Sequence, residues 1–273
     1  MKIALIQQRA TQDKPSNIAR GLANLEAAAR IGAKLACYAE LAFEWFHPQH
    51  PAAGDVRSLA EPLDGPLVRA FRDKAREHGI VVVLNLFERQ GEATFDSSPV
   101  IDADGTLLGV TRMVHITEYA CFHEQGYYTP GDTGAPVFRT RAGNVGVAIC
   151  YDRHFPEYMR ALALAGADLV VVPQAGAVGE WPEGLYEAEM RVAAFQNGYH
   201  VALCNRVGRE DRLDFAGESF VCAPDGSVIA RAGQGTEEIL YADVDLASAD
   251  RSHARQLFLR HRRPELYAPW LTK

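Results

Sequence analysis

Apolar runs alternate with amphipathic segments along the first ninety residues of the chain. The runs that predict buried strands cover residues 1–7, 35–38 and 80–87. The segments whose apolar side chains keep helical spacing cover residues 15–32 and 65–79. Each helical segment begins beside a proline and ends at a glycine, which are ordinary start and stop signals. This part therefore reads as strand–helix–strand units.

From residue 99 onwards the pattern changes to hairpins, and then returns to helices and strands. The hairpin arms cover residues 99–102, 106–113, 137–140 and 145–149, with turns at 103–105 and 141–144. Further helices are expected at 155–166 and 184–197, strands at 168–173 and 200–205, hairpins around 223–226 and at 238–245, and a short helix with an extended tail at 247–273. This order predicts an α/β fold, an α-β-β-α sandwich of two facing sheets with outer helices, in one domain spanning residues 1–273.

Two long segments without regular periodicity interrupt these elements, at residues 41–63 and 117–136. Loops of that length inside a compact domain are usually functional. Three polar or nucleophilic side chains lie in such places. Glu40 follows the second strand, Glu124 lies in the second long loop, and Cys150 follows the strand at 145–149. Strand ends and loops are where α/β proteins place their ligands.

Composition narrows the class of protein. The formal charge of −7 gives no reason to expect nucleic acid or an anionic membrane as a partner, and no apolar run approaches the roughly 18 residues of a membrane span. The five cysteines are an odd number without a C-x-x-C pair. We therefore expect a reduced, cytoplasmic protein without structural zinc.

Cys150 is the centre of the candidate chemistry. An apolar strand ends at this cysteine, and Pro156-Glu157 suits the first turn of a following helix. Several hydrolases present a nucleophile at such a strand-to-helix corner. A small buried apolar side chain is the alternative, and it is the commoner role for a cysteine. A glutamate nearby would favour the nucleophile, because a carboxylate can take the thiol proton before attack on an amide-like carbon.

Seven ordered segments make the chain resemble the nitrilase superfamily of carbon–nitrogen hydrolases from end to end. They are LACYAE (35–40), RMVHI (112–116), YYTPGD (127–132), VGVAICYDRHFPE (145–157), NRVG (205–208), FAGES (215–219) and RRPELY (262–267). The resemblance implies an α-β-β-α sandwich and a homodimer, or a higher homo-oligomer, with residues 247–273 at the interface. It also implies a cofactor-free hydrolase that acts on a small amide or N-carbamoyl compound.

Site residues follow from the same resemblance. It implies Glu40 as general base, Cys150 as nucleophile and Glu124 as a helper that orients substrate and supports proton transfer. The backbone N–H of Tyr151 would donate to the oxyanion. Arg153 resembles an arginine that some carbamoyl hydrolases of the family use to hold a substrate carboxylate. A structural ion pair is the equal alternative for this side chain.

Two aromatic residues have equally open roles. Trp181 lies in a segment that resembles a substrate-side loop of the family, and Tyr119 lies in the loop at 117–136. Either side chain can line the pocket, and plain packing is the alternative for both.

One position departs from the family pattern. Met113 occupies the place of the catalytic lysine, because the segment from His115 to Cys150 aligns without a gap. Strand alternation points Arg112 to the opposite face, whereas His115 shares the face of Met113 and is a candidate partial substitute. Losing one oxyanion donor costs about 10²–10³ in rate. A weakened hydrolase and a catalytically impaired ligand-binding or scaffold protein both fit this substitution.

Overall fold

The computed structural model describes residues 1–271 and shows two β-sheets packed face to face. The strands of the first sheet are β1 (Lys2–Gln7), β2 (Leu35–Tyr38), β3 (Val81–Val83), β4 (Leu86–Gln90), β5 (Ala93–Ile101), β6 (Leu107–Arg112) and β17 (Glu238–Asp243). They are ordered β17-β1-β2-β3-β5-β4, and β6 pairs with β5. Strands β1, β2 and β3 are parallel, and β5 is antiparallel to its partners.

The second sheet has the order β16-β15-β12-β11-β10-β9. Its strands are β9 (Val137–Thr140), β10 (Gly143–Val147), β11 (Leu169–Gln174), β12 (His200–Asn205), β15 (Phe220–Cys222) and β16 (Val228–Arg231). Two small sheets pair β7 (Glu118–Tyr119) with β8 (Phe122–His123), and β13 (Val207–Arg209) with β14 (Asp214–Ala216).

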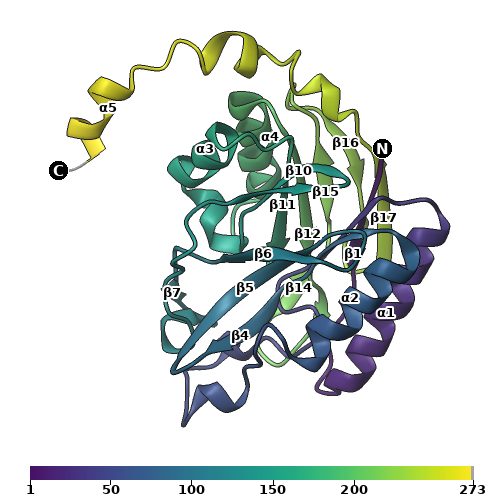
Figure 1. Ribbon diagram of the computed structural model, residues 1–273. Helices are drawn as coiled ribbons and strands as arrows, with labels where there is room; N and C mark the ends of the chain where they lie inside the picture. Colours follow the sequence, from purple (N-terminus) through teal and green to yellow (C-terminus); the bar gives the residue numbers. More distant parts are fainter. Residues whose placement is uncertain (272–273) are drawn as a thin grey trace.

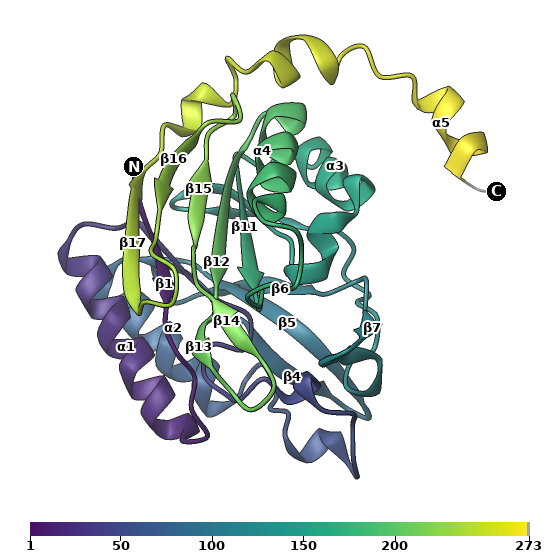
Figure 2. The same ribbon diagram turned by 180° about the vertical axis from the view of Figure 1, so that it is seen from behind.

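Helices cover the outer faces of both sheets (Figures 1 and 2). The longer helices are α1 (Lys14–Arg30), α2 (Pro66–His78), α3 (Pro156–Leu164), α4 (Leu185–Asn197) and α5 (Pro264–Leu271). Short 3-10 turns cover His47–Gln49, Val56–Ser58, Glu124–Gly126, Cys150–His154 and Leu246–Ser248, and a π turn covers Ala254–Phe258. Helices α1 and α2 contact the first sheet, and α4 contacts the second. The predicted α-β-β-α sandwich is confirmed. Among residues 1–271, no helix has both the length and the apolar character needed to cross a bilayer.

Strand β12 contributes alternate side chains to two hydrophobic cores, one on each face of its sheet. Ala202 and Cys204 belong to the core between the sheets, and Val201 and Leu203 belong to the core under α3 and α4. Successive side chains of a strand point to opposite faces, so a strand buried on both sides is apolar at every position. This explains the continuous apolar runs at 35–38 and 201–204.

The apolar run at 80–87 was predicted as one strand, and this was wrong. The chain forms β3 and β4 along one edge of β5, with an interruption at Leu84 and Asn85. Leu84 donates to the carbonyl of Pro99 (3.2 Å), but proline has no N–H to return the bond. The interruption turns the Asn85 side chain inward, where it bonds to Asp96 and to the backbone of Leu41.

Strand β5 also begins at Ala93 instead of at residue 99. The first half of this strand was not predicted, because it contains four polar residues, Thr94, Asp96, Ser97 and Ser98. All four are buried, and neighbouring polar groups bond to them, as Asn85 does to the Ser98 hydroxyl (3.1 Å). The polar side chains of this strand are buried and hydrogen-bonded inside the protein. The strand therefore lacks the alternation of apolar and polar residues that is typical of a half-exposed strand.

The end of the chain differs from the predicted short helix and extended tail. After β17 the chain passes through the turns at Leu246–Ser248 and Ala254–Phe258, and α5 ends an arm that reaches away from the body (Figure 1). Residues 272 and 273 of the predicted tail lie outside the described residues.

The backbone of Gly131 packs closely against that of Arg112 and Met113, and this contact predicts how a substitution at Gly131 changes stability. Gly131 donates to the Met113 carbonyl (2.8 Å), and a Cβ here would lie 2.3 Å from the Arg112 backbone oxygen. We expect Gly131→Ala to lower the free energy of unfolding by about 1–3 kcal/mol, because backbone must move to admit the methyl group. Urea denaturation measures this. Gly134→Asn is the control: Gly134 has φ +66° with nothing within 4 Å, and asparagine tolerates that conformation, so its stability should change little. Equal losses in both variants would contradict the argument.

Candidate functional site

Cys150 stands at the corner between β10 and α3, as the sequence predicts. The residue begins the turn Cys150–His154 and has φ 39°, a left-handed conformation that costs energy for a side chain other than glycine. The N–H of Ala175 donates to its sulfur. Cys150 is only 8% exposed, so it is a buried residue. Pro156 opens α3 just beyond this turn.

Glu40 lies in a similarly constrained corner after β2. Leu41 has φ 45°, and its N–H donates to the Asn85 side chain (2.7 Å). The buried guanidinium of Arg206 donates to the backbone carbonyls of Glu40 (2.9 Å) and Leu41. These bonds fix the backbone at the glutamate and at the residue after it. Arg206 was quoted only as part of a sequence motif, and its clamping role was not predicted.

The structure brings Glu40, Glu124 and Cys150 into one buried cluster. The Glu40 carboxyl lies against the Cys150 thiol, and the charges of Glu40 and Glu124 both act on that thiol. Glu124 comes from the 3-10 turn that follows β8, and it accepts a hydrogen bond from the N–H of Thr117 (3.3 Å). Both carboxyl side chains are fully buried.

A fourth member of the cluster, Asp96, was not found from the sequence. Its carboxyl lies against that of Glu40 and accepts a hydrogen bond from Asn85 (2.5 Å). The β5–β6 register places Ser97 opposite Arg112, so Asp96 lies opposite Met113, and the Met113 N–H donates to the Asp96 carbonyl (2.9 Å). Finding Asp96 required this register, because an aspartate in a polar stretch gives no signal by itself.

Burial and mutual repulsion govern the protonation of the cluster. Burial, followed by the charge of Glu124, raises the pKa of Glu40 to about 8. Burial and the charge of Glu40 raise the pKa of Asp96 well above its ordinary value, and burial with Asp96 does the same to Glu124. Burial and the two glutamates also raise the pKa of the Cys150 thiol well above its ordinary value. The resting cluster therefore favours protonated groups at neutral pH.

The charge of Arg206 acts on Glu40 and that of Arg153 acts on Cys150, but neither arginine is paired with a carboxyl of the cluster. No lysine or arginine forms an ion pair with the side chain of Glu40, Asp96 or Glu124 in this part of the chain. Both Glu40 oxygens, Asp96 Oδ2 and Glu124 Oε1 are buried without a hydrogen-bond partner. Met113 is fully buried where the family resemblance places a lysine.

Neither neighbour of Met113 replaces that lysine. Arg112 pairs with Glu88 (2.6 Å) and Asp132 (2.8 Å), as its opposite face predicts. The expectation for His115 was wrong: its ring pairs with Asp152 (2.7 Å) and stacks on Phe155 at 3.5 Å between centroids. The N–H of His115 also donates to Asp152, and this turns the residue away from the strand alternation that was assumed.

Arg153 is held by groups of the protein itself. Its guanidinium pairs with Glu189, donates to Gln174 (2.9 Å) and lies over the Tyr186 ring. Of the two interpretations left open by the sequence, the structure shows the ion pair. A substrate carboxylate would have to compete with Glu189 for this cation.

The two aromatic residues considered from the sequence lie close together, and Tyr119 lies near Cys150. The Tyr119 hydroxyl donates to Glu180 (2.5 Å), and the Tyr119 ring lies 6.1 Å from that of Trp181. Trp181 also contacts the His154 ring, which in turn packs edge-on against Tyr151. Tyr119 and Tyr186 are near enough to Cys150 for the thiolate charge to raise the pKa of each hydroxyl, after the larger effects of burial and Glu180.

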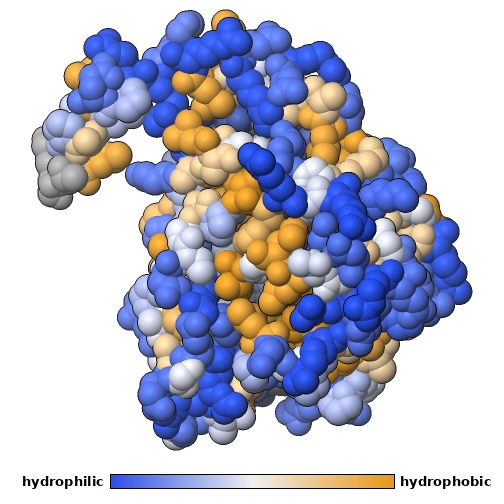
Figure 3. All heavy atoms as spheres, in the orientation of Figure 1, coloured by the Kyte–Doolittle hydropathy of each residue, from blue (hydrophilic) through white to orange (hydrophobic). Residues whose placement is uncertain are grey.

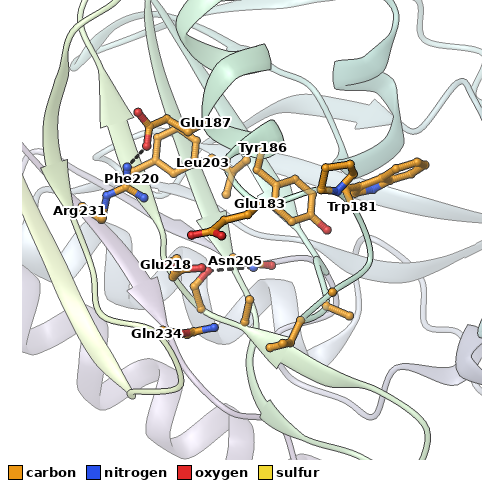
Figure 4. A pocket seen from close by; sticks show the side chains of 17 residues that line it. Trp181, Glu183, Tyr186, Glu187, Leu203, Asn205, Glu218, Phe220, Arg231 and Gln234 are labelled. Atoms are coloured by element: carbon orange, nitrogen blue, oxygen red, sulfur yellow. Dashed lines mark hydrogen bonds and ion pairs between the residues drawn. The ribbon is translucent and has the colours of Figure 1, made fainter.

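A cavity of about 450 Å³ adjoins this aromatic group (Figure 4). Trp181 and Tyr186 form part of its wall, and Cys150 does not line it. The cavity carries the carboxylates of Glu183, Glu187 and Glu218. Arg231 is the basic residue among the described lining residues, and it is paired with Glu187.

The cluster is arranged for proton transfer and nucleophilic attack. A carboxylate whose pKa is raised beside a buried thiol is a suitable general base near neutral pH. Within residues 1–271, no group of three or more His, Cys, Asp or Glu side chains is arranged to hold a metal ion.

Comparison with known proteins gives a consistent result. Residues 2–254 match the family model described as carbon–nitrogen hydrolase. The chain is 34% identical to N-carbamoylputrescine amidase of Solanum lycopersicum, over 99% of this chain and 94% of that protein. A carbon–nitrogen hydrolase from Helicobacter pylori G27 superposes with a TM-score of 0.90 at 27% identity, over 100% and 99% of the two chains.

A second solved structure bears on the cysteine. It is a variant of the Nesterenkonia sp. AN1 amidase that shows Michael addition of acrylamide at the active-site cysteine. It superposes with a TM-score of 0.84 at 28% identity, over 99% of each chain. Sequence, fold and site thus lead to one conclusion: this chain belongs to the carbon–nitrogen hydrolase family, within the nitrilase superfamily.

Proposed function

We propose that the protein hydrolyses the C–N bond of a small amide or N-carbamoyl compound through a thioester on Cys150. The observation that carries this proposal is the Glu40 carboxyl against the Cys150 thiol in a buried site. Glu40 takes the thiol proton, and the thiolate attacks the carbonyl carbon. Ammonia or an amine leaves with that proton, and water then hydrolyses the thioester.

The other site residues support these steps in our proposal. Glu124 orients the scissile group and assists proton transfer from the far side of the thiol. The N–H of Tyr151, in the turn that begins at Cys150, donates to the developing oxyanion. Tyr119 and Trp181 contact the substrate at the approach to Cys150.

Met113 in place of a lysine should lower the rate of hydrolysis by this mechanism. A buried thioether cannot stabilise an oxyanion as an ammonium would, and the loss of one such donor costs about 2.7–4 kcal/mol. We therefore propose a slow amidase or carbamoylase. The competing proposal, which Met113 also supports, is a ligand-binding or scaffold protein that retains the fold without turnover.

The similarity to N-carbamoylputrescine amidase supports an N-carbamoyl substrate. Two features of this chain favour a distal group that is neutral or cationic over a carboxylate. Arg153 is already paired with Glu189, and the cavity beside Trp181 is acidic.

For the assembly, we propose a homodimer in which the arm of residues 247–271 packs on a second copy. Trp270 and Leu271 on this arm are 61% and 64% exposed, and α3 and α4 expose Leu164 and Val192. Figure 3 shows apolar side chains on both the arm and the body. Such surface is normally covered in an interface. We further propose a cytoplasmic location, which the five free cysteines support.

The direct test is ammonia release from a panel of small amides and N-carbamoyl compounds. We expect slow release by the wild type, none by Cys150→Ala, and an acyl adduct on Cys150 in the intact mass spectrum. Cys121→Ala is the matched control because this residue of the same region is also a free cysteine, and it should keep full activity. Tight binding of these compounds with an unmodified thiol would favour the scaffold alternative instead.

The raised pKa of Glu40 makes stability depend on pH. Because its folded pKa of about 8 exceeds the ordinary value of 4.5, its contribution is fully present below 4.5 and is lost as pH rises through 8. Glu40→Gln removes this loss. We expect the variant to exceed the wild type in stability by on the order of 2–4 kcal/mol at pH 8, and by much less at pH 5.

Urea denaturation at both pH values measures the effect, and Glu44→Gln is the control of opposite sign. Burial raises the pKa of Glu44, but His47 and Lys14 outweigh it and lower the pKa. Glu44→Gln should therefore destabilise the protein at pH 8. A Glu40→Gln variant that is less stable than the wild type at pH 8 would contradict the assigned protonation.

Met113→Lys tests the electrostatic environment of the thiol. An ammonium beside Cys150 should lower the thiol pKa and raise its alkylation rate by iodoacetamide at pH 7 about tenfold or more. Peptide mass spectrometry of Cys150 gives the rate, and Met113→Leu, which adds no charge, should match the wild type. Equal rates in all three proteins would show that position 113 does not act on the thiol.

A further inference from the structure

The buried cluster presents several unpartnered acceptors to its interior, and the hydroxyl of Tyr128 is an unpartnered donor near them. Glu40 contributes two unpartnered oxygens, and Asp96 and Glu124 contribute one each. All three side chains are fully buried. Unsatisfied buried acceptors are costly, and several in one site that also holds a nucleophile call for a ligand rich in N–H donors.

We propose that the Cys150 site also hydrolyses guanidinium and amidinium groups, and that it prefers a guanidino compound to the ureido compound of the same shape. The positive charge of the substrate would then lie beside Asp96 and Glu40, where Met113 leaves the protein without a cation. This inference rests on the proposed function, since it uses the same nucleophile and base.

The position of Asp96 carries the geometric part of the argument. Asp96 and Met113 face each other across neighbouring strands, so the carboxyl and the thioether share one face of the sheet. Asn85 satisfies Asp96 Oδ1, and Oδ2 stays unpartnered beside Glu40. A guanidinium is planar and has five N–H donors and no acceptor, and it matches carboxylates in pairs. A urea in the same place would turn its carbonyl oxygen toward other acceptors.

Charge balance distinguishes the two substrates at the step of attack. Thiolate addition to a ureido or amide carbon creates an oxyanion, which no ammonium stabilises at position 113. Thiolate addition to a guanidinium carbon combines one negative and one positive charge and gives a neutral intermediate. In a site of low dielectric this difference is large.

The reaction balances with water as the only other reactant. Glu40 takes the Cys150 proton, the sulfur lone pair forms the C–S bond, and the C=N π pair returns to nitrogen. One C–N bond breaks, and its nitrogen leaves as ammonia with the proton held by Glu40. Water then adds to the S-amidino cation, the C–S bond breaks and the thiolate returns; Glu40 takes one proton of the water and passes it to the thiolate, and ammonia takes the other. A guanidinium ion and water become a ureido compound and an ammonium ion.

The approach to the site suits a cation for independent reasons. The rings of Tyr119 and Trp181 lie 6.1 Å apart, and aromatic rings attract guanidinium groups. Glu180 accepts hydrogen bonds from the hydroxyls of Tyr119 and Tyr186 and adds a carboxylate at the same point. The adjoining cavity is acidic as well, since Arg231 within it is paired with Glu187.

Matched substrate pairs provide the test. N-carbamoylputrescine is compared with agmatine, and 3-ureidopropanoate with 3-guanidinopropanoate, because each pair differs only by an oxygen against an NH₂⁺ group. The readouts are kcat/KM for ammonia release and, on Cys150→Ala, binding by calorimetry. We expect the wild type to favour the guanidino member of a pair about tenfold or more, and Cys150→Ala to bind it more tightly.

Variants of the two facing residues sharpen the result. Met113→Lys should reverse the preference, raising kcat/KM for the ureido member by about 10². Met113→Leu should keep the wild-type preference. Asp96→Asn should lower kcat/KM for the guanidino member about tenfold more than it lowers that for the ureido member.

The possible outcomes distinguish a failure of this inference from a failure of the proposed function. Wild-type hydrolysis of the ureido members without hydrolysis or binding of the guanidino members would overturn the inference and leave the proposed function intact. Absence of turnover for every member, with no adduct on Cys150, would overturn both. The wild-type comparison decides these cases even if a variant fails to fold.

Discussion

Charge balance in the buried cluster around Cys150 is the constraint on which the site depends. Three carboxyls and a thiol share an interior in which, within residues 1–271, no lysine or arginine is ion-paired with any of the three carboxyls. Such groups cannot all be ionised together, so protons or a ligand must supply the missing positive charge. The pKa values of Glu40, Asp96 and Glu124 are raised because burial and mutual repulsion disfavour their ionised forms. The assignment of a substrate class follows from it as well.

The fold keeps these groups together despite their repulsion. Corners after β2 and β10 carry Glu40 and Cys150, and each corner contains a residue with positive φ. Asn85 and Arg206 bond to the backbone of the first corner, and the N–H of Ala175 reaches the second. The strained conformations persist because well-packed sheets surround them. Rigid backbone on several sides is what holds the cluster in the reactive arrangement.

Much of this could be predicted from the sequence, and the exceptions have physical reasons. Periodicity located the main helices, and the ordered motifs pointed to Glu40, Glu124 and Cys150, which the structure brings together. Asp96 was missed because its importance comes from strand register, which no local pattern reveals. The misplaced role of His115 has the same origin, since its pairing with Asp152 joins residues far apart in the chain.

The most direct test of the central claim is the protonation of Asp96 in the resting protein. The infrared difference spectrum between the wild type and Asp96→Asn at neutral pH reports whether that carboxyl is neutral or ionised. The account predicts loss of a carbonyl band of a protonated carboxylic acid, since burial and Glu40 raise the pKa of Asp96. Loss of carboxylate bands alone would show that Asp96 is ionised without a cation and would contradict the account.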